Sequence, residues 1–314
     1  MLGGGGGTRN PSIRHHSAIG NQQPEQPSLI DLHLHTTASD GRLAPSDLVE
    51  LASASGLTII SVTDHDTIAG LAEAGAAADR LGVRLIDGVE ITAVETGRDV
   101  HLLGYFFDPM NAGLRSLLLA QRADRVRRVR QMGERLAGLG CAVDLDVLLN
   151  EAESQPGRSI GRPGLADALI QAGHAQDRGD AFNRWLGVGR PAFVARRGAS
   201  VAQVVEIIGT AGGITSLAHP YLTGIDNRIA SFAASGLAAL EARHSQQDVA
   251  AEMRYRQMAS RLDLVVSGGS DFHADPSHRI AELGIVTLPP ADFAALEARA
   301  SSLRRPGDPS ISLT

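Results

Sequence analysis

Residues 29–35 read Leu-Ile-Asp-Leu-His-Leu-His, an apolar run with histidines at alternate positions, and this run decides the fold. Alternate residues of a β-strand point to one face, so His33 and His35 can hold the same metal ion. Asp40 follows in a Ser-Asp-Gly turn. Alone, the histidine pair is also compatible with two exposed side chains on a half-buried strand, and Asp40 with a simple turn.

Six more apolar runs rich in β-branched residues follow and are predicted strands. They are Thr58–Thr63, Arg84–Thr92, Val100–Phe107, Gly213–Ala218, Leu237–Ala242 and Leu264–Ser267. Helical patterns lie between most of them, at residues 45–55, 68–81, 202–211 and 249–262. Because strands alternate with helices, the pattern predicts a parallel sheet with crossover helices, in the α/β class.

Side chains that can bind a metal ion recur at the carboxyl-terminal end of these runs. Those in or just after the carboxyl-terminal half of a run are His33, His35, Asp40, His65, Glu90, His219, His244, Asp271 and His273. His101 lies early in its run and is the exception. Active sites of βα folds lie at the carboxyl ends of the strands. A core histidine has no reason to recur there in strand after strand, so we predict one site that holds several metal ions.

The donor types narrow the choice of metal. Imidazole together with carboxylate suits zinc, manganese or iron rather than calcium or magnesium. Asp64 and Asp66 flank His65. Two roles are open for these carboxylates. They orient the imidazoles of metal ligands, or they cap the following helix.

Composition excludes several classes of protein. The chain has 314 residues, of which 29 are basic and 35 acidic, and its formal net charge is −6. That balance argues against a duplex DNA partner. The single cysteine, Cys141, excludes an internal disulfide framework and is compatible with the cytoplasm. No apolar run approaches the ~20 residues of a membrane span, so no membrane partner is expected. Residues 1–28 are rich in Gly, Gln and Pro, without a signal sequence, and are expected to be a disordered tail.

Six stretches together resemble the PHP family, named for polymerase and histidinol phosphatase. They read DLHLHTTASDG, SVTDHDT, DGVEIT, VHLLGY, LAHP and GGSDFH and fall between residues 28 and 288. The resemblance implies a distorted (β/α)₇ TIM-like barrel with two or three divalent metal ions at the carboxyl ends of its strands. We expect residues 29–107 and 196–290 to form the barrel, and residues 291–314 a C-terminal helix and tail.

The resemblance also implies a metal-ligand set. A first metal would be held by His33, His35, Glu90 and Asp271. Glu90 would bridge to a second metal, held also by His101 and His219. A third metal would be held by Asp40, His65 and His273. Manganese is the expected metal, with iron or zinc as alternatives. Many members have His where Asp40 stands, and Asp is typical of the branch that acts on nucleotide phosphomonoesters.

An inserted lobe is expected between residues 108 and 195, because His101 and His219 are too far apart for one crossover. Helical patterns there cover residues 114–139, 145–152, 164–172 and 178–186. Within it, the stretch IGRPGLA resembles a motif of the nucleoside-bisphosphate phosphatase branch, which commonly has His where Gly164 stands. Arg162 could bind a phosphate group or pair with Asp167.

Further residues are candidates for substrate contact and catalysis. Arg196 and Arg197 precede the next helix and could bind a second phosphate. His244 could contact phosphate or protonate the leaving oxygen, or it could be an exposed loop residue. His65 and Asp271 are the other catalytic candidates. The long helix expected in the lobe carries six arginines, which favour a solvent-exposed helix face. The alternative is a positively charged rim that captures the phosphates of an RNA end. The six are Arg122, Arg125, Arg127, Arg128, Arg130 and Arg135.

The predicted function is metal-dependent hydrolysis of a phosphate ester. The resemblance implies release of the 3′-phosphate from a nucleoside 3′,5′-bisphosphate, and trimming of short RNA from its 5′ end, so a small nucleotide or an RNA end is the expected partner. Histidinol-phosphate phosphatase is an alternative, which Asp40 and the GRP-containing lobe disfavour. A non-catalytic metal-binding module is another, which the complete ligand set disfavours. The oligomeric state is left open.

Overall fold

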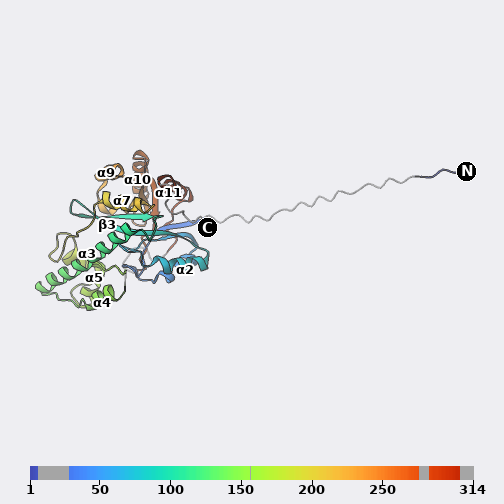
Figure 1. The fold of residues 1–314 in the computed structure, drawn as a ribbon. Coiled ribbons are helices and arrows are strands. Elements are labelled where there is room, and N and C mark those ends of the chain that lie inside the picture. Colours follow the sequence, from blue (N-terminus) through green and yellow to red (C-terminus); the bar gives the residue numbers. More distant parts are fainter. Residues whose placement is uncertain (6–27, 156, 276–282, 305–314) are drawn as a thin grey trace.

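Seven strands in sequence order form one sheet that curls into a nearly closed barrel (Figure 1). The computed structural model describes residues 1–5, 28–155, 157–275 and 283–304. The strands are β1 (Leu29–Leu34), β2 (Leu57–Val62), β3 (Arg84–Glu95), β4 (Arg98–Tyr105), β5 (Ile214–Leu217), β6 (Ala239–His244) and β7 (Val265–Gly269). The expected α/β fold with a TIM-like barrel of seven strands is therefore confirmed.

Helices cover the outside of the barrel. They are α1 (Pro45–Ala54), α2 (Leu71–Leu81), α3 (Ala112–Gly138), α4 (Asp146–Ser154), α5 (Arg162–Gln171), α6 (Arg178–Ala181), α7 (Val201–Thr210), α8 (Pro220–Thr223), α9 (Ile229–Ala234), α10 (Val249–Arg261) and α11 (Pro290–Leu303). A π-helical turn, η1 (Phe182–Leu186), follows α6, and a 3₁₀ turn, η2 (Asp226–Arg228), precedes α9. The sequence did not predict the short α8, η2 and α9. The expected tail over residues 1–28 lies mostly outside the described residues.

Strand β4 is antiparallel to both of its neighbours, β3 and β5, so the expectation of a wholly parallel sheet was wrong at this strand. The cause is the connection from β3, a two-residue turn at Thr96 and Gly97 with φ angles of 49° and 78°. Such a hairpin is too short for the crossover that parallel neighbours need. Because β4 runs backwards, its first half lies where the other strands finish. This explains why His101 comes early in its strand.

Strands β1 and β7 meet and bring the ends of the sheet together. The backbone N–H of Asp271 donates to His33 (2.9 Å), and that of His35 donates to Phe272 (2.9 Å). Gly269 permits this approach, since a Cβ added there would lie 2.6 Å from the Cβ of His33. The carboxyl end of β1, which carries His33 and His35, is thus fixed directly against the segment that carries Asp271.

One half of the barrel interior is apolar and closed by a helix. Ile30, Leu32 and Tyr105 belong to a buried cluster that includes Phe293 and Leu296 of α11. The hydroxyl of Tyr105 donates to the Leu32 carbonyl (2.9 Å). Apolar packing fills this end, so the polar interior residues gather at the other.

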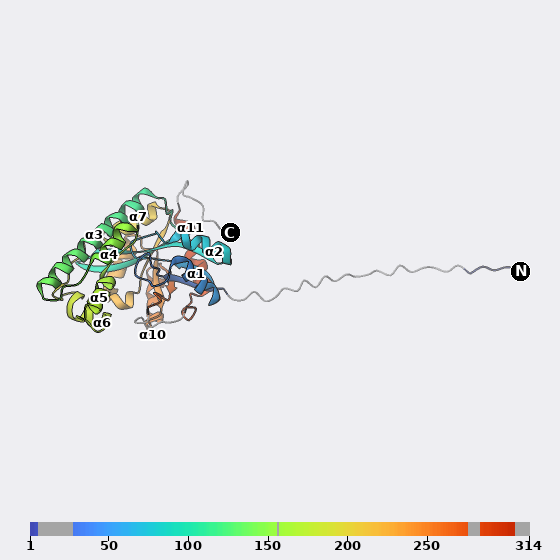
Figure 2. The same cartoon turned by 90° about the horizontal axis from the view of Figure 1, so that it is seen from below.

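Helices α3 to α6 lie together along one side of the barrel (Figure 2). Helices α3, α5 and α6 share a core that includes Met132, Leu136, Leu165 and Leu169, whereas α4 has no buried residue. This is the region expected to be a helical lobe. None of the helices in the described ranges combines the length and apolar character that crossing a membrane requires.

The long helix α3 is not solvated all round. Arg125 and Arg128 are only 7% and 4% exposed, so the solvated-face interpretation was wrong for these two arginines. Arg130 and Arg135 are exposed, as expected. Arg125 turns toward the barrel because the buried carboxylate of Asp66 lies opposite, 2.6 Å from its Nε.

We predict that Gly269→Ala destabilises the protein, because the added methyl group collides with β1. Overpacking of this kind costs about 1–3 kcal/mol in free energy of unfolding. Urea titration followed by circular dichroism measures the change.

Gly209→Ala in α7 is the matched control, since a Cβ there meets nothing within 4 Å. Its higher helix propensity should stabilise the protein by about 0.5–1 kcal/mol. Equal stability of the two variants would show that contact with β1 does not limit residue 269.

Candidate metal centre

The structure brings all nine predicted metal ligands to one end of the barrel. Their donor atoms form four overlapping groups, within each of which the atoms lie within 4.8 Å of one another. The groups are His33, His35 and Asp271; His33, Glu90 and His219; His65, Glu90 and His101; and His35, Asp40, His65 and His273. Since the groups share members, they make one continuous cluster.

Glu90 of β3 lies at the centre of the cluster and is fully buried. Its two oxygens contact imidazoles from β1, from the ends of β2 and β5, and from β4. Oε2 lies 3.4 Å from His33 Nε2, 3.3 Å from His35 Nε2 and 2.9 Å from His65 Nδ1, and Oε1 lies 2.8 Å from His101 Nδ1 and 3.1 Å from His219 Nε2. Burial raises the pKa of Glu90, but the surrounding imidazoles outweigh it and hold that pKa well below its usual value.

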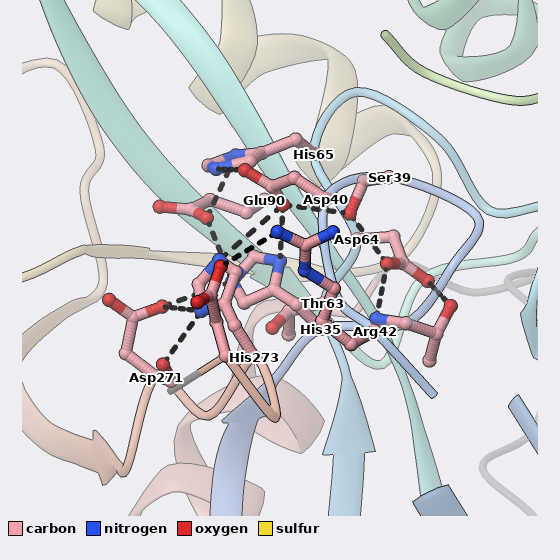
Figure 3. Close-up of polar contacts among 12 residues, drawn as sticks. His35, Ser39, Asp40, Arg42, Thr63, Asp64, His65, Glu90, Asp271 and His273 are labelled. Carbon is pink, nitrogen blue, oxygen red and sulfur yellow. Dashed lines mark hydrogen bonds and ion pairs between the residues drawn. The ribbon is translucent and has the colours of Figure 1, made fainter. Parts of the chain in front are cut away.

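Two further carboxylates flank Glu90. Asp271 Oδ1 lies 3.3 Å from His33 Nε2 and 3.1 Å from His35 Nε2. Asp40 lies among the rings of His35, His65 and His273 (Figure 3), with its nearest oxygen 3.4 Å from His273 Nε2. Each carboxylate thus serves a different part of the cluster.

The backbone is strained at two of these residues. His219 and Asp271 follow β5 and β7 and have φ angles of 28° and 57°. Positive φ is uncommon for residues other than glycine and costs about 1–3 kcal/mol. The surrounding structure holds this strain at the points where the chain leaves the barrel and both side chains enter the cluster.

The residues fit divalent metal ions. Buried atoms that make no hydrogen bond within the described structure include His33 Nε2, His35 Nε2, His65 Nδ1 and Glu90 Oε2. Leaving such atoms unsatisfied is costly, and metal ions would use their lone pairs. The charge balance of the cluster also favours bound cations. Burial lowers the pKa of His35, but contacts with Asp271 and Glu90 outweigh it and raise that pKa to about 10, so these carboxylates favour a positive charge beside them.

Glu241 of β6 is a site residue that sequence reasoning missed. It is fully buried. Its Oε1 accepts a hydrogen bond from His33 Nδ1 (2.9 Å), and its Oε2 accepts one from the backbone N–H of His219 (2.6 Å). A carboxylate on the remote nitrogen fixes the tautomer and orientation of a ligating imidazole. The available signal was one acidic residue inside the apolar run LAALEA.

Asp64 and Asp66 neither orient an imidazole nor cap the following helix, the two roles expected of them. Asp64 accepts hydrogen bonds from the backbone N–H of Thr36 (2.8 Å) and from the hydroxyl of Ser39 (2.6 Å), so it fixes the loop that carries Asp40. Asp66 bonds to the backbone N–H of Thr92 (2.9 Å) and to Arg125. Neither caps α2, whose N-cap is Gly70 without a side-chain bond.

The cluster opens into a cavity of about 510 Å³. Its lining includes Pro163, Arg178, Phe182, Leu222 and Gln246 in addition to the candidate ligands. Sequence reasoning missed Arg178 and Phe182. The Phe182 ring lies at the start of the π-helical turn, and such turns are frequent at functional sites. Arg178 donates to Asp167 (2.7 Å) and also bonds to Asp275.

The candidates for substrate contact lie in different environments. Arg162 pairs with Asp99 (3.4 Å) and not with Asp167. Arg196 is buried and bonds to Asp66 (3.1 Å). Arg197 is exposed, and its backbone N–H donates to Asp124 (3.0 Å).

His244 and Gly164 also have defined surroundings. The ring of His244 is fully buried rather than exposed, with Nε2 3.5 Å from Asp271 Oδ2. A side chain at Gly164 would begin 2.8 Å from Leu148 Cδ1, so Leu148 fills the space where the branch commonly has His.

Comparison with known proteins supports this description. The PHP domain family model matches residues 31–148. A 5′-3′ exoribonuclease of Haemophilus influenzae is 38% identical over 250 residues, which cover 77% of this chain and 89% of that protein. A 3′,5′-nucleoside bisphosphate phosphatase of Chromobacterium violaceum is 34% identical, over 78% of this chain and 87% of that protein. A crystal structure of a predicted metal-dependent phosphoesterase from Bifidobacterium adolescentis matches with a TM-score of 0.77 and 33% identity, over 87% of this chain and 98% of that one.

We predict that Mn²⁺ stabilises the protein against heat and that EDTA reverses the effect. Bound metal would satisfy the buried nitrogen atoms and balance the three carboxylates, and a ligand at 100 times its Kd stabilises by about 2.7 kcal/mol. Differential scanning calorimetry measures the shift. An unchanged Tm in saturating Mn²⁺ would contradict a metal centre here.

We also predict that Glu241→Gln weakens metal binding by about 10- to 100-fold, because His33 loses its charged partner. Competition with a chelator of known affinity measures the change. Glu206→Gln, at an exposed position of α7, is the matched control. Equal metal affinity in the two variants would remove Glu241 from the centre.

Proposed function

The chain belongs to the PHP family of metal-dependent phosphoesterases, and on that premise we propose that it hydrolyses the 3′-phosphate of nucleoside 3′,5′-bisphosphates. The products are a nucleoside 5′-phosphate and inorganic phosphate. The chain matches most of the length of both curated relatives, one named for this activity and one for 5′-3′ exoribonuclease activity. The single observation that carries the proposal is the Glu90-centred cluster, which opens into a cavity of about 510 Å³.

The proposed metal ligands are the nine residues of the cluster, seven of which line this cavity. His33, His35 and Asp271 would hold one ion, His101 and His219 a second, and Asp40, His65 and His273 a third, with Glu90 between them. Manganese is the proposed metal, and iron or zinc would suit the same donors. Bound divalent metals supply Lewis-acid activation of water and neutralise charge on the phosphate.

His244 is the proposed proton donor to the leaving oxygen. Its Nδ1 accepts a hydrogen bond from the backbone N–H of Gln246 (3.1 Å). The neutral ring therefore carries its proton on Nε2, the atom that faces Asp271. The Asp271 contact is 3.5 Å long and makes no hydrogen bond, so this nitrogen keeps its proton available for the leaving oxygen. Asp271 and His65 both line the cavity, and His65 completes the proposed catalytic set.

Trimming of short RNA from its 5′ end would use the same site. The candidate metal cluster lines a cavity of about 510 Å³, and the Haemophilus influenzae relative is named for this activity. Histidinol phosphate is a poorer candidate, because Asp40 stands where that branch usually has His. A non-catalytic module is disfavoured, because the structure keeps every candidate ligand within the cluster.

We predict that His33→Ala and Asp271→Asn lower kcat by about 100-fold or more, since several kcal/mol of charge stabilisation is lost. The assay is phosphate release from adenosine 3′,5′-bisphosphate in Mn²⁺, with histidinol phosphate as the competing substrate. Circular dichroism checks that each variant is folded.

His174→Ala is the matched control, because that ring lies against the Ala142 carbonyl in the lobe. It should keep wild-type activity. Near-normal turnover of either ligand variant would refute the proposed site, and preference for histidinol phosphate would refute the proposed substrate.

A further inference from the structure

An ion-pair network joins the lobe to two loops of the metal centre. Two of its members lie on the loops that follow β1 and β7, and the other two lie in the lobe helices α5 and α6. Each of its two carboxylates contacts both of its guanidinium groups, so the formal charges cancel. We call these four residues the clamp, and they are Arg42, Asp167, Arg178 and Asp275.

The lobe side of the clamp is held by paired hydrogen bonds. Arg178 donates to both oxygens of Asp167, from Nε (2.7 Å) and from Nη2 (2.7 Å). Such paired bonds fix the direction of the guanidinium as well as its distance. The Nη1 of Arg178 donates to Asp275, whose side chain is only 4% exposed. Arg178 is therefore held by the lobe and by a barrel loop at the same time.

The barrel side completes the clamp. Arg42 Nη2 lies 3.2 Å from Asp167 Oδ2 and 3.4 Å from Asp275 Oδ2. The backbone N–H of Arg42 donates to the His273 carbonyl (2.9 Å) (Figure 3). The loops after β1 and β7 are thus joined to each other as well as to the lobe.

These two loops carry two candidate ligands of the third metal ion. Asp40 precedes Arg42 by two residues, and His273 precedes Asp275 by two. Two residues of chain span at most about 7 Å, so a shift of either clamp residue displaces the ligand beside it. Asp64 fixes the start of the Asp40 loop. The clamp fixes the far side of the same loop.

Ligands of the other two ions are fixed from within the barrel. Glu241 of β6 accepts from His33 Nδ1 (2.9 Å) and from the backbone N–H of His219 (2.6 Å). His101 lies within β4. The lobe therefore has a specific connection to the third ion, through the loops of Asp40 and His273.

The charge of Arg178 explains why its carboxylate partners matter. Burial lowers the pKa of Arg178, but hydrogen bonding and charge from Asp167, with the charges of Asp275 and Asp40, outweigh it and raise that pKa. Arg178 lines the same cavity as Asp40. A guanidinium that lost Asp167 would be free to pair with Asp40, and it would then compete with a metal ion for that carboxylate.

We propose that Asp167 and Arg178 are positioning residues for the metal ion held by Asp40, His65 and His273. Asp167 keeps the guanidinium of Arg178 away from Asp40, and the clamp holds the two ligand loops in place. Binding of this ion and attachment of the lobe are then coupled, and each stabilises the other. The inference rests on the proposed function, since it assumes the third of the proposed metal sites.

The first test counts metal ions in the absence of substrate. The full chain is freed of metal with a chelator and dialysed against graded concentrations of Mn²⁺, and the bound manganese per chain is measured. Asp40→Asn changes a direct ligand, so the ion that it weakens is identified as the third. Asp167→Asn should weaken the same ion by about 10-fold or more, the loss typical when a residue that orients a ligand is removed.

Controls separate positioning from general damage to the lobe. Among the described residues, Asp167 is not one of those that line the metal cavity, so its substitution removes no substrate contact there. Asp167→Glu keeps the carboxylate and should restore Mn²⁺ binding. Glu153→Gln breaks another ion pair of the lobe, with Arg130 at 3.1 Å, and should bind Mn²⁺ like wild type. Arg42→Gln, at the most exposed position of the clamp, should act in the same direction as Asp167→Asn.

A double-mutant cycle tests which ion the clamp serves. In the Asp40→Asn background, Asp167→Asn should weaken Mn²⁺ binding no further, because the ion that it positions is already lost. Circular dichroism checks that each variant is folded.

The outcomes separate this inference from the proposed function. Weakening of the third ion alone by Asp167→Asn, with Asp167→Glu and Glu153→Gln at the wild-type level, supports the clamp. Unchanged Mn²⁺ binding in both Asp167→Asn and Arg42→Gln overturns it, and so does equal weakening by Glu153→Gln. Additive loss in the double variant assigns Asp167 to a different ion and also overturns it. If wild-type protein hydrolyses no phosphomonoester, the proposed function is refuted, and the manganese counts still decide the clamp.

Discussion

The buried carboxylate of Glu90 is the contact on which the rest of the molecule depends. It lies inside a barrel, away from water, where a lone negative charge is very unfavourable. Imidazoles from separate strands surround it, and its pKa stays well below the usual value. The barrel must therefore bring several distant strands to one point and hold positive charge there. Closure of the sheet, the strained residues after β5 and β7, and the placement of Glu241 all serve this requirement.

The apolar and polar halves of the barrel have different effects on stability. The half closed by α11 is packed with aliphatic and aromatic side chains, and it adds to the burial energy of the larger core that the strands form with the outer helices. The other half holds buried acids and imidazoles, whose desolvation is a cost to stability. The single reversed strand, β4, crosses between the halves in the direction opposite to its neighbours. It thereby adds His101 and Asp99 to the polar end without needing another crossover helix.

Much of the site was predictable because its residues are encoded in short local patterns. The spacing of His33 and His35 fixes a shared face whatever the rest of the chain does, and strand ends are recognisable from composition. The remaining features depend on tertiary contacts. The direction of β4 follows from a two-residue turn, and the role of Glu241 follows from the closure of the barrel, which brings this side chain of β6 to His33 of β1. The burial of Arg125 could not be read from helical periodicity, because an acidic partner on the barrel draws a charged residue inward.

The contact between Arg125 and Asp66 has a consequence for how the enzyme is built. Asp66 immediately follows the candidate ligand His65, and two guanidinium groups neutralise it, that of Arg125 in α3 and that of Arg196 before α7. An insertion of this kind is not a detachable accessory. A truncated chain without α3 would leave the buried Asp66 with Arg196 as its one remaining guanidinium partner among the described residues, next to the candidate metal ligand His65. Lobe and barrel should accordingly fold and melt as one cooperative unit, and sequence drift in either part is constrained by the other.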